Sequence, residues 1–378
     1  MDADVFGQVL DAVRDFVRKE VVPREAEIDE RDEIPARIRE KAAELGLFGW
    51  ALPEEYGGLG LGMAEDVRLA IELGWTTPAF RSLFGTNNGI AGQAIVHHGT
   101  PDQRTRWLPR LAAGGAIASF ALTEAEAGSD PGGLTSRAVR DGDRYRLSGT
   151  KRFITNAPLA EVFVTFARTD PESTGRHGIS AFLVPAGAPG VTVGPHDTKM
   201  GQAGAWTSEV VFDDVELSAD ALVGAEGKGF GIAMASLARG RLHIAALCVG
   251  LAERALAEAV EYARTARQGG RVIGEYQLVQ ALLAESHAEL AAGRAMVHEA
   301  AAKYDSGEDR KLGPSSAKLF CTEMLGRVAD RAVQVHGGTG YVRGVTVERI
   351  YRDARLFRIY EGTSEIQKLV IARQLLKG

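Results

Sequence analysis

The spacing of the apolar residues changes twice along this chain of 378 residues, and the change limits the folds open to it. Up to about residue 115, apolar side chains recur every three or four positions, as in amphipathic helices. Between about 116 and 225 the period falls to two, in short runs bounded by Gly, Pro and Asp that are typical of strands. The helical period then returns in longer segments. The pattern predicts an α+β, mainly α protein with an N-terminal helical domain (1–115), a middle antiparallel β domain (116–225) and a C-terminal four-helix bundle (226–378).

Local signals place several of these elements. Val9, Leu10 and Val13 lie on one face of a first helix that Pro23 is expected to end. Further helices are expected within 33–49, 63–74, 101–114, 275–304 and 315–337. A hairpin is expected within 137–147, turning at Asp141–Gly142.

Composition and charge exclude several classes of protein. The net charge is −6 and the Lys and Arg residues are scattered, which argues against a nucleic-acid surface. The N-terminus lacks the pattern of a secretory signal. The apolar stretch 243–260 is interrupted by Glu253 and Arg254, so a buried helix is expected there and no membrane span. Cys248 and Cys321 lie far apart and outside CxxC spacing, which favours a reducing cytoplasm.

Common cofactor and catalytic motifs are missing from the sequence. The glycine clusters at 224–231 and 336–344 lack GxGxxG spacing, and Gly337 is expected to end a helix as a left-handed cap. The eight histidines lack metal-ligand spacing, so no metal is expected, and there is no GxSxG elbow. We interpret His243, within an apolar helix, as a core histidine whose hydrogen bonds are satisfied.

Two polar stretches, 118–130 and 150–157, begin as strands and end in small or hydroxyl residues. Thr123, Ser129 and Thr155, with the backbone N–H groups around Gly128, are suited to hold a flat polar ring or a phosphate. Taken singly, each hydroxyl fits a turn-stabilising role equally well.

A carboxylate near the C-terminus also needs an explanation. In "YEGTSEIQKLVIARQL" (360–375), Ser364 and Gln367 have the spacing of a capping box, and Ile366, Leu369 and Val370 form an apolar stripe behind it. Glu361 lies upstream of this helix, on a bend beside Gly362.

Seven strings occur in the order and with the separations seen in the acyl-CoA dehydrogenase family, and the chain resembles that family from about residue 5 to 377. They are "LGLFGWALPEEYGGLGLG", "FALTEAEAGSD", "KRFITNA", "VVFDDVEL", "QVHGGTGY", "YRDAR" and "IYEGTSEIQ". The resemblance implies a flavoenzyme that binds FAD between the β domain and the bundle, usually as a homotetramer, a dimer of dimers. It implies oxidation of an acyl-CoA to the trans-2-enoyl-CoA, with transfer of a hydride to flavin N5 and an electron-transfer flavoprotein as acceptor. Glu361 matches the catalytic base, and the other base position known in the family falls on Gly240, which has no side chain.

The same resemblance implies roles for further residues. Arg241, Tyr360 and Gly362 match the border of the acyl-CoA site, together with Ser129. The positions matched to FAD are Phe120, Leu122, Thr123, Gly128, Ser129, Phe153, Thr155, Thr363 and Glu365, with Gln277, Gln334, Gly337 and Gly338 reaching the FAD of a neighbouring subunit. For Arg241, a helix-packing ion pair is the alternative.

The sequence departs from the family at a contact with FAD. Ala266 and Gly269 stand where an Arg and a Phe are common, and Ala203 stands where a basic residue is common. Arg267 is a candidate replacement. The alternative is weak FAD retention, or a non-catalytic relative that binds acyl thioesters.

Arg81 is a lone cation in an apolar helical stretch, at the position where glutaryl-CoA dehydrogenases bind the distal carboxylate of their substrate. It therefore suggests an ω-carboxylated acyl-CoA, with a surface or interdomain salt bridge as the alternative. An oxidase that passes electrons to oxygen would keep the same fold, although the Glu at position 361 disfavours nitroalkane oxidation and the chain is short for an acyl-CoA oxidase.

Overall fold

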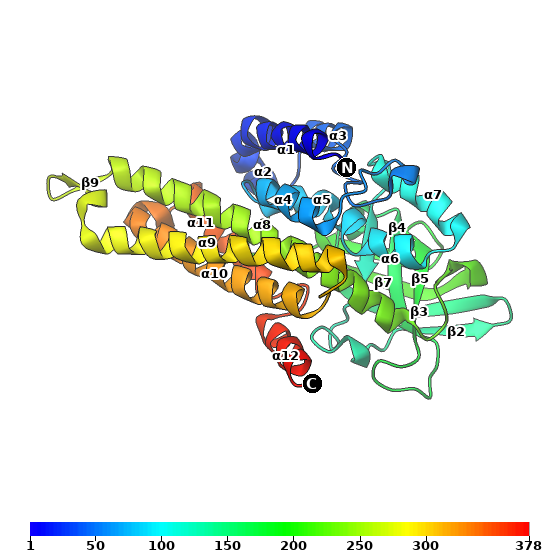
Figure 1. The fold of residues 1–378 in the computed structure, drawn as a ribbon. Coiled ribbons are helices and arrows are strands. Elements are labelled where there is room, and N and C mark those ends of the chain that lie inside the picture. Colours follow the sequence, from blue (N-terminus) through cyan, green and yellow to red (C-terminus); the bar gives the residue numbers. More distant parts are fainter. Residues whose placement is uncertain (378) are drawn as a thin grey trace.

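The structure, a computed structural model, describes residues 1–377 and begins with an N-terminal layer of helices (blue to cyan in Figure 1). Its helices are α1 (Ala3–Phe16), α2 (Glu25–Arg31), α3 (Ala36–Glu44), α4 (Met63–Leu73), α5 (Pro78–Asn88), α6 (Ala91–His98) and α7 (Pro101–Ala112). Thr77 caps α5 and is followed by Pro78, a residue preorganised for the first helical position.

The prediction that Pro23 ends the first helix is wrong. After α1 the chain continues through a π-helical turn (Val17–Val21) and a 3₁₀ turn (Val22–Arg24) into α2. Pro23 lies in the first turn of the 3₁₀ segment, where its missing N–H removes no helical hydrogen bond. The proline therefore accompanies a change of helix type.

The middle of the chain forms one sheet of eight strands in the order β6-β7-β3-β2-β4-β5-β8, with β1 beside β4. The strands are β1 (Ala118–Ala121), β2 (Arg137–Asp141), β3 (Arg144–Thr155), β4 (Val162–Arg168), β5 (Ile179–Pro185), β6 (Val191–His196), β7 (Thr207–Ser218) and β8 (Leu222–Val223). The sheet is mostly antiparallel, as predicted, but β1 pairs with β4 in parallel. The predicted hairpin is β2–β3, and since Asp141 pairs with Arg144, its turn is Gly142–Asp143.

The C-terminal part is a bundle built on one long central helix. Its helices are α8 (Gly229–Thr265), α9 (Gln277–Ser306), α10 (Leu312–His336), α11 (Thr346–Phe357) and α12 (Ser364–Leu375), with a small hairpin, β9 (Arg267–Gln268) and β10 (Arg271–Val272), after α8. Between residues 240 and 252 every residue of α8 is buried, including the polar residues Arg241 and His243. By length and composition α8 is able to cross a membrane, but 72% of its apolar window is buried inside the protein.

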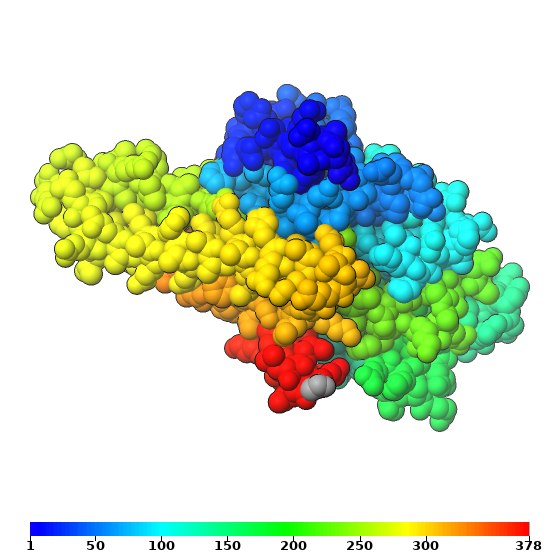
Figure 2. All heavy atoms as spheres, viewed as in Figure 1, coloured from blue at the N-terminus to red at the C-terminus, as the bar shows by residue number. Residues whose placement is uncertain are grey.

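Three groups of buried residues hold these layers together. One joins α1, α4 and α5 to the bundle, the second lies between α6, α7, the start of α8 and one side of the sheet, and the third lies within the sheet around Tyr145, Phe163 and Phe212. The bundle tip around β9 stands out beyond the N-terminal helices, and α12 lies on the surface (red in Figure 2). Consequently the apolar stripe predicted on α12 is not buried in a single chain, and Leu369 is 49% exposed.

Candidate active site

Glu361 lies in the turn between α11 and α12, and its backbone conformation is unusual. Its φ is 53° and that of Gly362 is 93°, so both residues are in the left-handed region, which costs a non-glycine residue about 1–2 kcal/mol. Two side chains hold the carbonyl of Glu361: Arg241 Nε donates to it at 3.4 Å and Gln367 Nε2 at 3.3 Å. Lys318 Nζ donates to the carbonyl of Gly362 at 2.6 Å. Such strain persists where the surroundings fix the backbone, and it is common at functional sites.

The carboxylate of Glu361 points at the bare backbone of Gly240 on α8. A β-carbon at Gly240 would overlap Oε2 of Glu361 and lie 3.1 Å from its Cδ, and 3.2 Å from a methyl group of Ile90. Oε2 is buried and has no hydrogen-bond partner within residues 1–377. Burial raises the pKa of Glu361, against the opposing charges of Arg81, Lys318 and Arg241. A carboxylate with a raised pKa and an unsatisfied oxygen is a suitable general base.

Arg81 is buried inside the N-terminal layer and forms no salt bridge within residues 1–377, although its charge acts on the carboxylate of Glu361. It lies on α5, is 7% exposed, and takes part in no salt bridge anywhere in the described chain. Two glycines of its own helix region leave room for it: a β-carbon at Gly85 would lie 2.7 Å from its Cζ, and one at Gly89 3.9 Å from its Nη2. The salt bridge considered as the alternative from sequence is therefore not formed.

Arg241 and Tyr360 border the same site. Arg241 follows Gly240 on α8, is buried, and has no carboxylate partner among residues 1–377, so the ion pair considered as its alternative is not formed either. Its burial lowers its pKa, against the charge of Glu361. Tyr360 packs edge-on against Phe357, and burial raises its pKa.

The predicted flavin-lining residues come together at the ends of β1 and β3. The N–H of Arg152 donates to the carbonyl of Thr123 at 2.9 Å, and Ser119 Oγ donates to the carbonyl of Thr155 at 2.8 Å. These bonds bring Phe120, Leu122 and Thr123, followed by Gly128 and Ser129, beside the end of β3.

Phe153 supplies an exposed aromatic face at this edge. A register shift between Lys151 and Ile154 gives Phe153 a φ of 57°, and the side chain is 60% exposed. A bulge re-aims a side chain out of the sheet, and a large aromatic ring left in solvent is a surface for another flat ring. The residues present therefore fit an isoalloxazine ring.

A buried ion pair supports this edge from below. Lys151 Nζ donates to Glu124 Oε1 at 2.7 Å, to the carbonyl of Phe166 at 2.6 Å and to that of Leu122 at 3.2 Å. Burial by itself would raise the pKa of Glu124, but Lys151 and hydrogen-bond donors at residues 135 and 136 lower it to about 2. The pair fixes the loop that follows Thr123.

Asn156 ties the β edge to the helix that carries Arg81, a role that sequence reasoning missed. Its side-chain amide donates to the carbonyls of Ser82 at 2.8 Å and Leu83 at 3.3 Å, and to Thr86 Oγ1 at 3.3 Å. Its presence in the "KRFITNA" string was the available signal.

Four of the predicted FAD contacts lie elsewhere. Gln277 opens α9, and Gln334, Gly337 and Gly338 lie at the end of α10, all exposed at the end of the bundle that carries β9 (Figure 1). The sheet packs at the opposite end of α8. Gly337 has a positive φ of 58°, but its ψ of −139° lies outside the left-handed helical region. Within one chain these residues do not join the site around Glu361.

The hairpin at the same end contains Gly269 and directly follows Ala266, two of the three departures from the family. Gly269 and Gly270 form its turn with φ of 57° and 80°, and Arg267 Nη2 donates to the carbonyl of Gly270 at 3.0 Å. Arg267 is thus engaged within its own hairpin, and Ala266 is the C-cap of α8.

The capping box predicted for α12 is wrong by one residue. Thr363 is the N-cap and its Oγ1 accepts from the N–H of Ile366, while Ser364 Oγ donates to Glu323 at 2.5 Å. Gln367, expected to close the box, instead donates back to the carbonyls of Glu361 and Gly362. Glu365 is exposed on the first turn.

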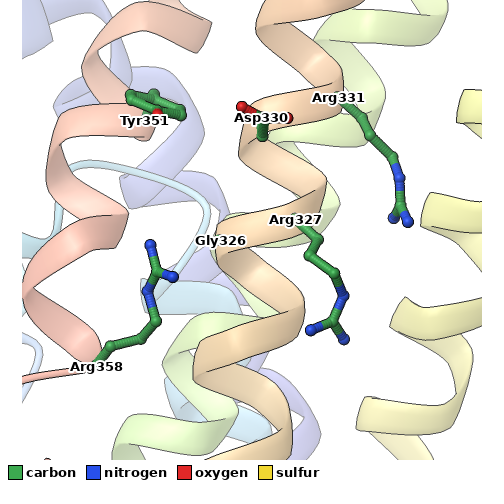
Figure 3. A pocket seen from close by; sticks show the side chains of 6 residues that line it. All are labelled: Gly326, Arg327, Asp330, Arg331, Tyr351 and Arg358. Atoms are coloured by element: carbon green, nitrogen blue, oxygen red, sulfur yellow. The ribbon is translucent and has the colours of Figure 1, made fainter. Parts of the chain in front are cut away.

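A surface pocket of about 390 Å³ lies between α10 and α11 and is lined by none of the predicted site residues. In Figure 3, Arg327 and Arg331 extend from α10, and Arg358 reaches into the gap from α11. These three arginines are paired with Glu285, Glu289 and Glu323, so their charges are already balanced.

Profiles of the acyl-CoA dehydrogenase family match three consecutive parts of the chain: the N-terminal domain at residues 7–115, the middle domain at 119–215 and the C-terminal domain at 227–376. The acyl-CoA dehydrogenase of Bacillus subtilis (strain 168) is 40% identical over 366 residues, covering 97% of this chain and 96% of the relative. The acryloyl-CoA reductase (NADH) of Anaerotignum propionicum is 41% identical over 366 residues, covering 96% and 92%. Subunit CarC of the caffeyl-CoA reductase–Etf complex of Acetobacterium woodii is 38% identical over 365 residues, covering 96% of each chain.

Solved structures agree with this result. Butyryl-CoA dehydrogenase from Megasphaera elsdenii superposes with a TM-score of 0.95 at 35% identity, covering 100% of both chains. Glutaryl-CoA dehydrogenase from Mycobacterium smegmatis gives 0.93 at 34% identity, covering 100% of this chain and 96% of the other. PigA, solved with FAD and proline, gives 0.95 at 29% identity, covering 100% of both.

The fold and the site define an oxidoreductase with a place for a flavin beside a buried carboxylate. The chain belongs to the acyl-CoA dehydrogenase family, a family of FAD-dependent oxidoreductases. The fold class, the family and the FAD cofactor predicted from sequence are thus confirmed.

Proposed function

We propose that this enzyme carries out α,β-dehydrogenation of an acyl-CoA to the trans-2-enoyl-CoA, with Glu361 as the base. The observation that carries the proposal is the buried Oε2 of Glu361, which has no partner within residues 1–377 and faces the bare backbone of Gly240. An α-hydrogen of a thioester is a weak acid, so its removal needs a close and partly desolvated base.

Other groups of the chain assist proton removal. The amide N–H of Glu361 forms no hydrogen bond among the described residues, so it is available to donate to a thioester oxygen as negative charge develops there. Lys318, Gln367 and Arg241 hold the turn, which keeps base and amide in a fixed relation. FAD, when bound along Phe153 and the end of β1, supplies the two-electron oxidant that takes the β-hydrogen as hydride at N5.

The test of this function is the variant Glu361→Gln, which keeps the shape of the side chain and removes the base. Loss of a general base slows the reaction by about 10²–10⁴-fold. We expect bleaching of the flavin absorbance by acyl-CoA under anaerobic conditions to slow by this factor, with FAD content unchanged. Undiminished bleaching would contradict the proposal. A colourless wild-type protein with no thermal shift on adding FAD would favour the non-catalytic alternative, and peroxide formed under air would favour an oxidase.

A second candidate concerns the substrate: an acyl-CoA that ends in a carboxylate, as in glutaryl-CoA. Arg81 supports it because its guanidinium is buried, forms no salt bridge in the described chain, and has an Nε without a hydrogen-bond partner, so an anion that joins it would offset the cost of its burial. A hydrogen bond to a charged group contributes about 1.5–3 kcal/mol, or roughly 10- to 100-fold in affinity.

The substrate proposal is tested by comparing glutaryl-CoA with butyryl-CoA. In Arg81→Met we expect kcat/KM for glutaryl-CoA to fall about 10- to 100-fold more than kcat/KM for butyryl-CoA. The exposed Arg68 on the neighbouring helix α4 provides a matched control, Arg68→Met. Equal losses for both substrates in Arg81→Met would exclude an ω-carboxylate role.

The remaining partners are proposals as well. An electron-transfer flavoprotein as acceptor is supported by the Etf complex named for the CarC relative. Assembly into a homotetramer is supported by the exposed apolar residues of α12 and by the four predicted FAD contacts at the far end of the bundle. The two buried free cysteines fit a cytoplasmic location.

A further inference from the structure

His243 forms part of a buried polar cluster that the proposed dehydrogenation does not use. Its Nδ1 lies 2.5 Å from Asp66 Oδ1, and Arg239 Nη2 donates to the other oxygen of Asp66 at 2.8 Å. The imidazole is 2% exposed and stacks on Trp50, with ring centroids 5.2 Å apart and planes 15° apart. Asp66 and Trp50 therefore fix both the plane of the ring and the direction of its second nitrogen.

That second nitrogen is not satisfied. Nε2 of His243 is buried and has no hydrogen-bond partner in the chain from 1 to 377, and the same holds for Nε of Arg81. The sequence-based interpretation of His243 as a satisfied core histidine is therefore wrong for one of its two nitrogens. A buried polar atom without a partner is destabilising, and such an atom in a native structure calls for a ligand or a functional explanation.

Both unsatisfied groups lie close to Glu361. His243 follows Gly240 by three residues on α8, so it lies on the same face of the helix, one turn beyond the point that Glu361 faces. Arg81 lies against Gly89, and Ile90, the next residue, contacts the position of Gly240. The charge of Arg81 acts on the pKa values of both Glu361 and His243, so its guanidinium lies near both groups.

Three charged groups act on the imidazole: Asp66 from α4, Arg239 from its own helix and Arg81 from α5. Burial and Arg81 lower the pKa of His243, which favours the neutral ring without ligand, with its proton on Nδ1 toward Asp66. Nε2 then presents a lone pair. A carboxylate can contact that nitrogen only with a proton between them, and Asp66 and the carboxylate both favour the imidazolium.

We propose that Arg81 and His243 form a two-armed subsite for the terminal carboxylate of a dicarboxylic acyl-CoA, in which His243 takes up a proton from solvent and donates it from Nε2 to the ligand. The inference rests on the proposed function and deepens it, because it names the second recognition group for the substrate. Asp66 acts as a positioning residue that holds the ring and stabilises its charge. No bond other than N–H changes, and nothing is oxidised or reduced in this step.

The first test uses two variants that replace one ring nitrogen each. His243→Asn places an amide nitrogen where Nδ1 was, so it retains a donor to Asp66 and removes Nε2. His243→Gln places an amide near the position of Nε2 and gives up the bond to Asp66. We expect KM for glutaryl-CoA relative to KM for butyryl-CoA to rise about 10-fold in His243→Asn and less in His243→Gln. An unchanged ratio in His243→Asn, with FAD content and melting temperature like the wild type, overturns the role of Nε2.

The second test measures protons directly. In a Glu361→Gln background, which stops turnover, glutaryl-CoA and butyryl-CoA are mixed with the holoenzyme in weak buffer containing an indicator dye. We expect up to about one more proton per site to be taken up with glutaryl-CoA, and this excess to be lost on adding His243→Asn. Equal uptake for the two ligands overturns the imidazolium.

The outcomes separate this inference from the function on which it rests. Undiminished turnover in Glu361→Gln overturns the dehydrogenase assignment itself. A wild-type enzyme that oxidises butyryl-CoA but neither binds nor oxidises glutaryl-CoA overturns the carboxylate subsite and leaves the role of Glu361 intact. If His243→Asn changes KM for both substrates equally, only the proposed contact between His243 and the carboxylate is overturned.

Discussion

The carboxylate of Glu361 occupies the space that a side chain at Gly240 would need, because a β-carbon there would overlap Oε2 and lie 3.1 Å from Cδ. The two positions from which a base is expected to act in this family therefore meet at one point, although they are 121 residues apart in the sequence. Only a residue without a side chain at position 240 leaves room for the carboxylate of Glu361 where it lies.

The first prediction is that Gly240→Ala displaces Glu361, the proposed base. A shift of about 1 Å in a reacting group can cost roughly 10²-fold in rate, so we expect a loss of that order in kcat. Gly231→Ala on the same helix is the control, because a β-carbon there meets nothing within 4 Å. The control should keep full activity and gain about 0.5–1 kcal/mol of stability. Equal kcat values in the two variants would contradict the prediction.

The second prediction moves the base to α8. In Gly240→Glu combined with Glu361→Gly, a carboxylate from α8 reaches the place vacated by the original one. We expect the double variant to recover at least about tenfold over Glu361→Gly alone in anaerobic flavin reduction, as expected for a general base that is present but imperfectly placed. No recovery, despite normal FAD content, would show that the two positions are not equivalent.

The third prediction concerns Lys318, whose ammonium is buried beside the turn that carries Glu361. Burial lowers the pKa of Lys318 to about 8, and its charge favours the ionised form of Glu361. Removing this charge in Lys318→Met raises the pKa of Glu361 further, so the acidic limb of the kcat/KM profile should move to higher pH. The exposed Lys368 on α12 gives the control, Lys368→Met. An unmoved acidic limb in Lys318→Met would refute the electrostatic role.

The fourth prediction concerns the buried pair Lys151–Glu124. Because Lys151→Met leaves Glu124 without its partner, we expect the free energy of unfolding to fall by about 3–5 kcal/mol in urea titrations. The exposed pair Lys19–Asp15 is the control, and Lys19→Met should cost no more than about 0.5 kcal/mol. A loss for Lys151→Met as small as that of the control would be evidence against the pair's role.

The pH dependence of this pair follows from its two shifts. The folded-state pKa of Glu124, about 2, lies below its ordinary value of 4.5, so its contribution is complete above pH 4.5 and is lost as the pH falls toward 2. Burial disfavours the charged form of Lys151 and lowers its pKa to about 8. The net contribution of the pair to the free energy of unfolding is therefore smaller than the Glu124 shift alone suggests.

The fifth prediction concerns Asn156, which has a φ of 61° and bonds α5 to the β edge. Asn156→Gly removes the side-chain amide, and glycine adopts the positive φ without strain. We therefore expect the free energy of unfolding to fall by about 1–3 kcal/mol and FAD to be released faster. Asn156→Ala adds backbone strain and should be about 1 kcal/mol less stable than Asn156→Gly. Equal stability of the two variants would show that the left-handed backbone has no role.

Periodicity predicted the order of helices, strands and helices well, because the 3.6- and two-residue patterns record which face of each element is buried. It failed at element ends. Pro23 and the N-cap of α12 were both misplaced, since several adjacent residues are chemically able to begin or end a helix and tertiary contacts choose among them. Ser364, a good capping residue, is engaged by Glu323 on another helix.

The amino-acid sequence by itself determined the layout of the chain, its family, and Glu361 as the acid opposite a glycine. Only the tertiary structure decided that, among the described residues, Arg81 forms no salt bridge and one nitrogen of His243 is left without a partner. Whether a buried charge or imidazole finds a hydrogen-bond or ion-pair partner depends on groups from segments far apart in the chain. Asp66 on α4 and the turn before α12 are examples of such groups. Hydrophobic spacing carries no record of those long-range polar pairings, because it reports the burial of a residue and not its neighbours.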